Sequence, residues 1–174
     1  MTDPRYPIGP LPKVGEVDDA WRRARIAEIE EAPARLRAAV EGLSPERLDT
    51  PYRPEGWTVR QVVHHVPDSH VNAYVRFKLA LTEDAPTIKP YEEDRWARLA
   101  DTRDTPVEVS LALLDALHSR WVVLLRSLGA ADFARSLNHP EKGLLSLDQM
   151  LNLYAWHGRH HVAHVTALCG RMGW

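Results

Sequence analysis

The sequence predicts an all-α protein, a four-helix bundle preceded by an extended N-terminal arm. Four long segments carry apolar residues at helical spacing, and the alternating pattern of strands is nearly absent. Three of these segments begin with Ser or Thr followed three residues later by Glu or Gln, the capping-box pattern of helix N-termini. With 174 residues, 44% of them hydrophobic, the chain is long enough for a single domain with its own core.

The N-terminal part divides into an arm and a first helix. Residues 1–16 contain four prolines, so we interpret them as an extended arm and residues 17–174 as the bundle domain. A helical pattern runs from about Asp18 to Gly42. Pro33 lies inside this pattern. Because proline removes a backbone donor and clashes with the preceding turn, the helix is expected to kink or split there.

The second helix follows a turn-rich loop at residues 43–57. Thr58 and Gln61 form its capping box, and the helical pattern continues to about Leu81. It crosses Pro67, which is expected to disturb the register of the residues that follow.

Two more helices follow a charged loop at residues 83–104. The third begins with a capping box at Thr105 and ends near Gly129. The chain is then irregular, with a short hairpin at about residues 138–142. A further capping box at Ser146 begins the fourth helix.

Charge and composition exclude several classes of function. A net charge of −2 gives no reason to expect a nucleic-acid-binding protein, because such proteins usually present a basic face. No apolar run is long enough to span a bilayer, and the N-terminus lacks the basic start and apolar stretch of a signal peptide. The single cysteine, Cys169, excludes an internal disulfide and suits a reducing compartment, so we expect a cytoplasmic protein.

Seven of the nine histidines fall in two helical clusters. One cluster, in the segment YAWHGRHHVAHV, contains His157, His160, His161 and His164. At about 100° per residue, His161 lies near the middle of the apolar stripe and His157 about 40° from it. His164 lies about 60° and His160 about 100° away, further toward solvent. His157 and His161 therefore form the inward pair, one turn apart.

The second cluster, in QVVHHVPDSH, contains His64, His65 and His70. Helical geometry places His70 nearest the apolar face, His65 at its edge and His64 pointing away. Because Pro67 disturbs the register, geometry leaves open whether His65 or His70 completes a site. Three histidines from two helices would leave a divalent ion with a position for water or substrate, which is typical of a catalytic ion.

Long blocks of the sequence indicate a family. The blocks are TPYRPEGWTVRQVVHHVPDSH, RFKLALTE, LHSRW, LYAWHGRHHVAHV and the closing RMGW. They closely resemble the YfiT-like members of the DinB superfamily, and the similarity extends from YPIG in the arm to Trp174. The resemblance implies a four-helix bundle that holds a divalent metal, zinc or nickel, with three histidines and that often forms a homodimer.

Transferred position by position, the resemblance implies His65, His157 and His161 as the metal ligands. The pair on the fourth helix agrees with the periodicity, whereas the resemblance alone selects His65 over His70. As residues that support the ligands or line the pocket, we consider Asp68, His70, Arg76, His118 and Arg120. Asp68 would accept the free N–H of a ligand histidine, and either arginine would bind a carboxylate of an acidic thiol.

The resemblance also implies the reaction. Similar proteins have been described as metal-dependent hydrolases, and others as S-transferases that use bacillithiol, a low-molecular-weight thiol. The first prediction is therefore a divalent-metal-dependent S-transferase that joins such a thiol to small electrophiles through a metal-activated thiolate. A hydrolase that uses metal-activated water is the first alternative. A non-catalytic metal-binding or interaction bundle is the second.

Overall fold

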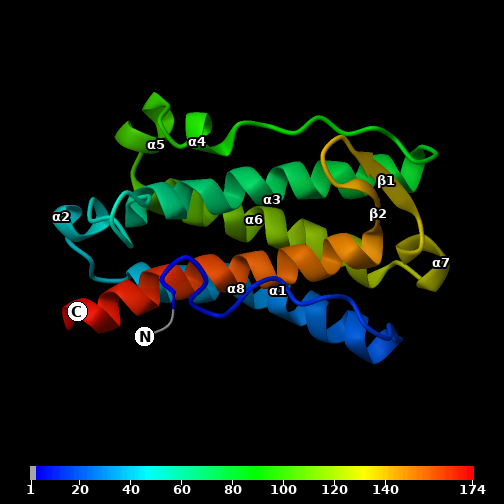
Figure 1. Ribbon diagram of the computed structural model, residues 1–174, viewed down its shortest axis with the longest axis horizontal. Helices are drawn as coiled ribbons and strands as arrows, with labels where there is room; N and C mark the ends of the chain where they lie inside the picture. Colours follow the sequence, from blue (N-terminus) through cyan, green and yellow to red (C-terminus); the bar gives the residue numbers. More distant parts are fainter. Residues whose placement is uncertain (1–2) are drawn as a thin grey trace.

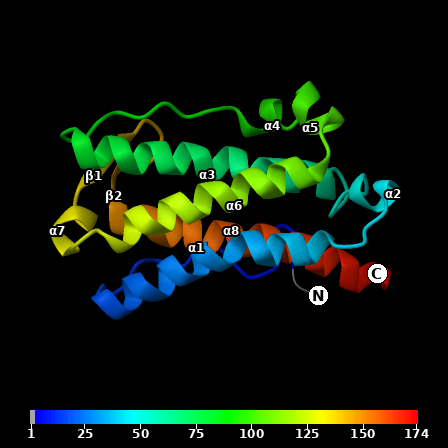
Figure 2. The same cartoon turned by 180° about the vertical axis from the view of Figure 1, so that it is seen from behind.

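Four long helices form the body of the protein (Figures 1 and 2). The computed structural model describes residues 3–174. The long helices are α1 (Asp19–Val40), α3 (Val59–Thr82), α6 (Val107–Arg126) and α8 (Leu147–Met172). Helix α1 packs against α6 and α8, and α3 packs against the same two helices, so α1 and α3 lie at opposite corners of the bundle. The predicted all-α four-helix bundle is confirmed.

Helix starts follow the sequence in two of the three predicted capping boxes. Thr58 accepts a hydrogen bond from the backbone of Gln61 at the start of α3, and Ser146 caps α8 in the same way. The prediction was wrong for Thr105, because its N–H bonds to the carbonyl of Asp101 and it ends the preceding short helix. Pro106 takes the N-cap position of α6 and has no side-chain acceptor to offer.

The two helix prolines lie in unbroken helices. Helix α1 continues through Pro33 over 22 residues, so the predicted split does not occur, and α3 continues through Pro67 over 24 residues. Both prolines are buried. An interior proline costs a helix about 3 kcal/mol, so the packing of the bundle keeps both helices continuous across their prolines.

Short elements connect the long helices at the two ends of the bundle. Strands β1 (Ser136–His139) and β2 (Gly143–Ser146) pair antiparallel and confirm the predicted hairpin, with Gly143 at a φ of 72°. The segment after α3 runs back along that helix toward the opposite end of the bundle (Figure 1). The remaining short helices are α2 (Pro45–Leu48), α4 (Glu93–Trp96), α5 (Ala100–Asp104) and α7 (Ala130–Phe133).

The N-terminal arm lies along α8 (Figure 1). From residue 3 to Asp18, the cap of α1, the chain contains no helix or strand, and the first two residues of the predicted arm lie outside the described residues. Asn152 of α8 donates a hydrogen bond to the carbonyl of Pro12 at 2.8 Å. The arm therefore covers one side of the fourth helix, next to its histidines.

The apolar core consists of two clusters separated by histidines. One cluster surrounds Phe77 and Trp121 at the end that carries the hairpin, and the other surrounds Leu114 at the opposite end. Between them lie His70 and His118, which are 0% and 2% exposed. The bundle thus contains a polar layer at its middle, where a site can form. Among residues 3–174, no helix combines the length and apolarity needed to cross a membrane.

Candidate metal centre

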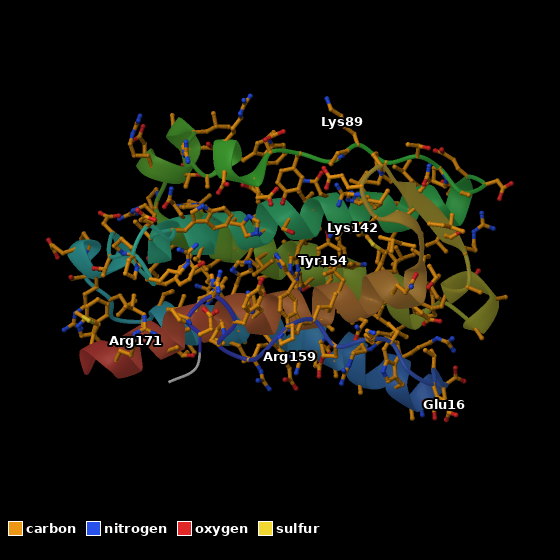
Figure 3. The ribbon with its side chains drawn as sticks, viewed as in Figure 1. Glu16, Lys89, Lys142, Tyr154, Arg159 and Arg171 are labelled. Carbon is orange, nitrogen blue, oxygen red and sulfur yellow. The ribbon has the colours of Figure 1, made fainter. Side chains whose placement is uncertain are left out.

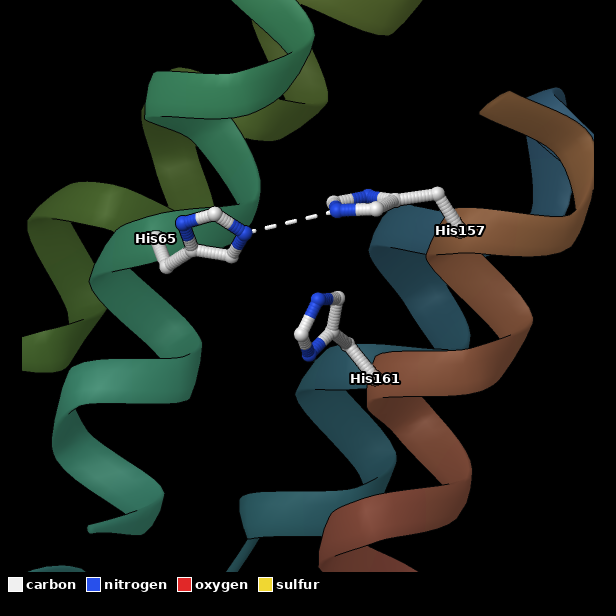
Figure 4. Close-up of side chains that lie close together, drawn as sticks. All are labelled: His65, His157 and His161. Carbon is white, nitrogen blue, oxygen red and sulfur yellow. Dashed lines mark hydrogen bonds between the residues drawn. The ribbon is translucent and has the colours of Figure 1, made fainter. Parts of the chain in front are cut away.

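Three imidazoles from two helices converge at the middle of the bundle (Figure 4). His65 comes from α3, and His157 and His161 come from successive turns of α8. One ring nitrogen of each lies within 4.8 Å of the others, and the two Nε2 atoms of His65 and His157 are 3.3 Å apart. Ligand nitrogens about 2 Å from a tetrahedral zinc ion are about 3.3 Å apart, so these rings fit a shared ion with small adjustments.

The electrostatic environment keeps the three rings neutral. Burial lowers the pKa of His65 to about 4. Burial and the neighbouring imidazoles lower the pKa values of His157 and His161 well below the ordinary value. Neutral imidazoles present lone pairs, which is the form that binds metal. Three neutral nitrogens suit borderline divalent ions such as zinc or nickel, so the donor set fits the ion that the sequence predicts.

A chain of imidazoles fixes the orientation of His157. Its Nδ1 lies 3.0 Å from Nε2 of His70, and Nδ1 of His70 lies 2.8 Å from Nε2 of His118. At the far end, Nδ1 of His118 faces the carbonyl oxygen of Ile29 in α1. A carbonyl only accepts, so each neutral ring in turn donates from Nδ1 and accepts at Nε2. His157 therefore keeps its proton on Nδ1 and presents the Nε2 lone pair to the cluster.

A second, looser chain holds His161. Its Nδ1 lies 3.4 Å from Nδ1 of His164, and Nε2 of His164 lies 3.3 Å from the carbonyl oxygen of Arg5 in the arm. By the same reasoning, His164 donates to the carbonyl and accepts from His161, which leaves Nε2 of His161 free. Tyr52 stacks on His164 with ring centroids 4.1 Å apart. Both ligand candidates on α8 are thus oriented by further histidines, in chains that end on a backbone carbonyl.

Some of the other predicted residues lie at the site, and some do not. His65 lies in the three-ring cluster, whereas His70 lies behind His157 and continues, with His118, to α1. Arg76 lines the adjacent cavity. Two candidates lie elsewhere among the described residues: no hydrogen bond joins Asp68 to a histidine ring, and Arg120 is exposed over the ring of Tyr74.

Three histidines are more buried than helical geometry predicted. His160 and His164 were expected toward solvent, but they are 7% and 3% exposed, because Tyr52, Trp156 and the arm cover them. His64 was expected to point away from the core, but it is 5% exposed and lies 2.7 Å from the hydroxyl of Ser110 in α6. A helical wheel cannot show which loops and helices cover a given face.

The three rings form one wall of a cavity of about 720 Å³. The arm, the loop before α3, the segment after α3, the hairpin and α8 supply the other walls. Tyr154 lies near the centre of the bundle, and Lys142 of the hairpin turn lies above it (Figure 3). Arg5, Tyr52, Trp57 and Tyr91 also line the cavity but lie in segments without regular structure, so helical periodicity could not predict them.

Comparison with known proteins identifies the family. The family model described as the DinB superfamily matches residues 28–165. The chain belongs to the DinB superfamily. It is 56% identical over 178 residues to "Putative metal-dependent hydrolase BcerKBAB4_2443" from Bacillus mycoides strain KBAB4, with 100% of both chains covered. It is 55% identical, again with full coverage of both, to "Putative metal-dependent hydrolase BCB4264_A2719" from Bacillus cereus strain B4264.

Two solved structures share the fold of this chain. YfiT from Bacillus subtilis is described as "a probable metal-dependent hydrolase with an unusual four-helix bundle topology". It matches 99% of each chain with a TM-score of 0.96 and 48% sequence identity. TT2238, described as a four-helix bundle protein, matches 84% of this chain with a TM-score of 0.59 and 21% identity, which shows the fold alone. The predicted resemblance to the YfiT-like DinB proteins is confirmed.

Proposed function

We propose that this chain is a divalent-metal-dependent S-transferase that joins a low-molecular-weight thiol of the bacillithiol type to a small electrophile. The observation that carries the proposal is the three-histidine cluster in the wall of a cavity of about 720 Å³. Three protein donors leave a bound ion with positions for a substrate. The cavity volume is within the range of small-molecule sites, about 300–1,000 Å³.

The charges of the cavity lining support a polar cosubstrate. Cationic and anionic side chains both line the cavity: Arg5, Arg53, Arg76 and Lys142, and Glu92, Glu93, Asp94 and Glu141. A water-soluble thiol that carries charged groups finds partners of either sign there. An apolar cosubstrate would desolvate the charged groups of this lining that have no partner within the chain, which costs free energy.

The composition of the cluster favours a thiol over water as the nucleophile. Within residues 3–174, the group that could hold an ion consists of three histidines and contains no carboxylate ligand. A thiol has a pKa of about 8.5 and needs much less acidification than water. Three neutral imidazoles around an ion are therefore sufficient to activate a thiol.

The residues of this chain would divide the work of the reaction. His65, His157 and His161 would hold the ion, which when bound would keep a thiol in its thiolate form at neutral pH. The thiolate sulfur forms a bond to the electrophilic carbon, the leaving group departs with the bonding electron pair, and the thiol proton passes to solvent. Trp57 lies edge-on against His65 and donates from Nε1 to Asp94, which fixes its ring as a wall of the site.

The experiment that tests the proposal is a transfer assay with zinc- or nickel-loaded protein, bacillithiol and 1-chloro-2,4-dinitrobenzene. We expect conjugate formation by the wild type and its loss in His65→Ala and His161→Ala. His64→Gln is the matched control, since it removes a buried histidine of α3 that does not line the cavity. Equal rates in the wild type and the two alanine variants would refute the assignment.

A hydrolase is the second candidate, and the names of the relatives favour it. Two Bacillus relatives that align over the full length of this chain carry the name metal-dependent hydrolase. Ester or amide turnover without any thiol, abolished by His65→Ala, would select this reaction. Bound metal with no turnover, with or without thiol, would instead select a non-catalytic metal-binding bundle.

A further inference from the structure

Arg76 is a buried cation without an anionic partner. It lies on α3, lines the cavity and is 8% exposed. Its Nη2 donates a hydrogen bond to the carbonyl of Lys89 at 3.0 Å. Within residues 3–174, no carboxylate lies at ion-pair distance from its guanidinium. A guanidinium is costly to bury unless it is paired, so this position is suited to an anion from outside the chain.

A second cationic side chain, Lys142, lies at the same end of the cavity. His139 and Lys142 of the hairpin line this end, and His139 is 8% exposed. Arg76 and Lys142 both lie close enough to His139 to lower its pKa together with burial. The nearby carboxylate of Glu141 is on an exposed residue, whose backbone N–H donates to Nδ1 of His139. Two permanent cations, Arg76 and Lys142, therefore lie near His139, beside the solvated carboxylate of Glu141.

This end of the cavity is adjacent to the histidine cluster. Tyr154 lies between them: it contacts Arg76, and its ring centroid is 5.8 Å from that of His157. Tyr154 is 4% exposed and fixed in the core, so it forms a rigid floor between the two. A molecule of a few carbon atoms that is held at Arg76 can extend across this floor to the cluster.

We propose that Arg76, assisted by Lys142, binds a carboxylate group of the substrate and directs the rest of that molecule toward His157. Guanidinium binds carboxylate through two parallel N–H···O bonds, which fixes orientation as well as affinity. The inference rests on the proposed function, because it assigns the charged end of the thiol or of the electrophile that the cavity receives.

The test uses succinate as a carboxylate probe and dimethyl succinate as its uncharged counterpart. Binding to the full chain is measured by calorimetry, with zinc and after treatment with a chelator, so that coordination of the probe to an ion is separated from binding at Arg76. We expect succinate to bind the wild type both with zinc and after chelation. Its affinity for Arg76→Gln should be at least tenfold weaker. Arg120→Gln, the matched control at an exposed arginine, should bind like the wild type, and dimethyl succinate should bind none of the proteins.

Two further variants distinguish loss of the carboxylate site from a folding defect. Arg76→Lys keeps the charge and should lose only part of the affinity, and Lys142→Gln changes an exposed turn residue and should weaken succinate binding several-fold. Circular dichroism checks that each variant is folded. Wild-type succinate affinity in folded Arg76→Gln, or no succinate binding by the wild type, would overturn the proposal.

Kinetics distinguish the source of the carboxylate and separate this inference from the proposed function. In Arg76→Gln, a raised KM for the thiol assigns the carboxylate to the thiol, and a raised KM for a carboxylate-bearing electrophile assigns it to the electrophile. If neither KM changes, the inference is wrong although the transferase stands. Arg76-dependent succinate binding without any transfer activity would refute the transferase and leave the anion site.

Discussion

Replacing His118 by leucine tests whether the buried imidazole chain sets metal affinity from a distance. His118 touches neither the cavity nor the three-ring cluster, but it accepts the Nδ1 proton of His70 at 2.8 Å. In His118→Leu, His70 either keeps a buried N–H without an acceptor or moves its proton to Nε2. In the second case, His157 must carry its own proton on Nε2, where the lone pair for the metal belongs.

The magnitude follows from the cost of either outcome. A buried donor left unpaired costs about 1–3 kcal/mol, and about 1.4 kcal/mol corresponds to a tenfold change in an equilibrium constant. Zinc affinity should therefore fall about 5- to 150-fold, in line with the 10- to 100-fold that outer-sphere partners of metal ligands typically contribute.

The assay is competition for zinc against a chromophoric chelator, at fixed pH, with wild type, His118→Leu and His64→Leu. The last variant also removes a buried histidine but lies outside the chain to His157. We expect it to retain wild-type affinity. Nitrogen-15 NMR should find the His157 proton on Nδ1 in the wild type and partly on Nε2 in His118→Leu. A folded His118→Leu protein with wild-type zinc affinity would refute the tautomer argument.

Three further predictions concern the second chain, the helix contact and acid stability. His164→Leu should lower zinc affinity less than His118→Leu does, because the hydrogen bonds of His164, at 3.3 and 3.4 Å, are longer. An equal or larger loss of affinity in the same competition assay would contradict this. Gly158→Val should lower the free energy of unfolding by about 1–3 kcal/mol in urea denaturation, because even a Cβ at this position would lie 3.1 Å from the Cβ of Ala32. An unchanged urea midpoint of unfolding would contradict this. Burial lowers the pKa of His118 from 6.5 to about 4, so the unfolded chain binds more protons between these values. The free energy of unfolding of metal-free protein should therefore fall as the pH drops through this window, by up to about 3 kcal/mol from His118 alone, and a flat pH profile would contradict the assignment.

The helices were predictable from the sequence because their signals are local. Capping boxes at Thr58 and Ser146, and apolar residues at helical spacing, mark helix starts and buried faces without knowledge of the neighbours. The inward pair His157 and His161 followed from the same periodicity. Thr105 shows the limit of a local signal. It matches the capping-box pattern, but it is the C-cap of the preceding short helix and does not cap α6.

The rest of the site depends on contacts between distant segments. His118 and Ile29 lie 89 residues apart in the sequence, and His164 and Arg5 lie 159 apart, so no local pattern could join them. Geometry also left His65 and His70 unresolved as partners of the α8 pair. The structure brings His65 into the cluster and sets His70 behind His157, a distinction that depends on how α3 packs against α8.

The most direct measurement is the metal content of the protein combined with X-ray absorption at the ion. After loading with zinc and removal of excess metal, the wild type and His64→Gln should hold about one ion per chain, coordinated by three imidazole nitrogens and non-protein oxygen. Single alanine replacements at His65, His157 and His161 should each remove most of the ion. Full occupancy in any of these three variants, or an ion enclosed by four protein donors, would contradict the account of an open three-histidine centre.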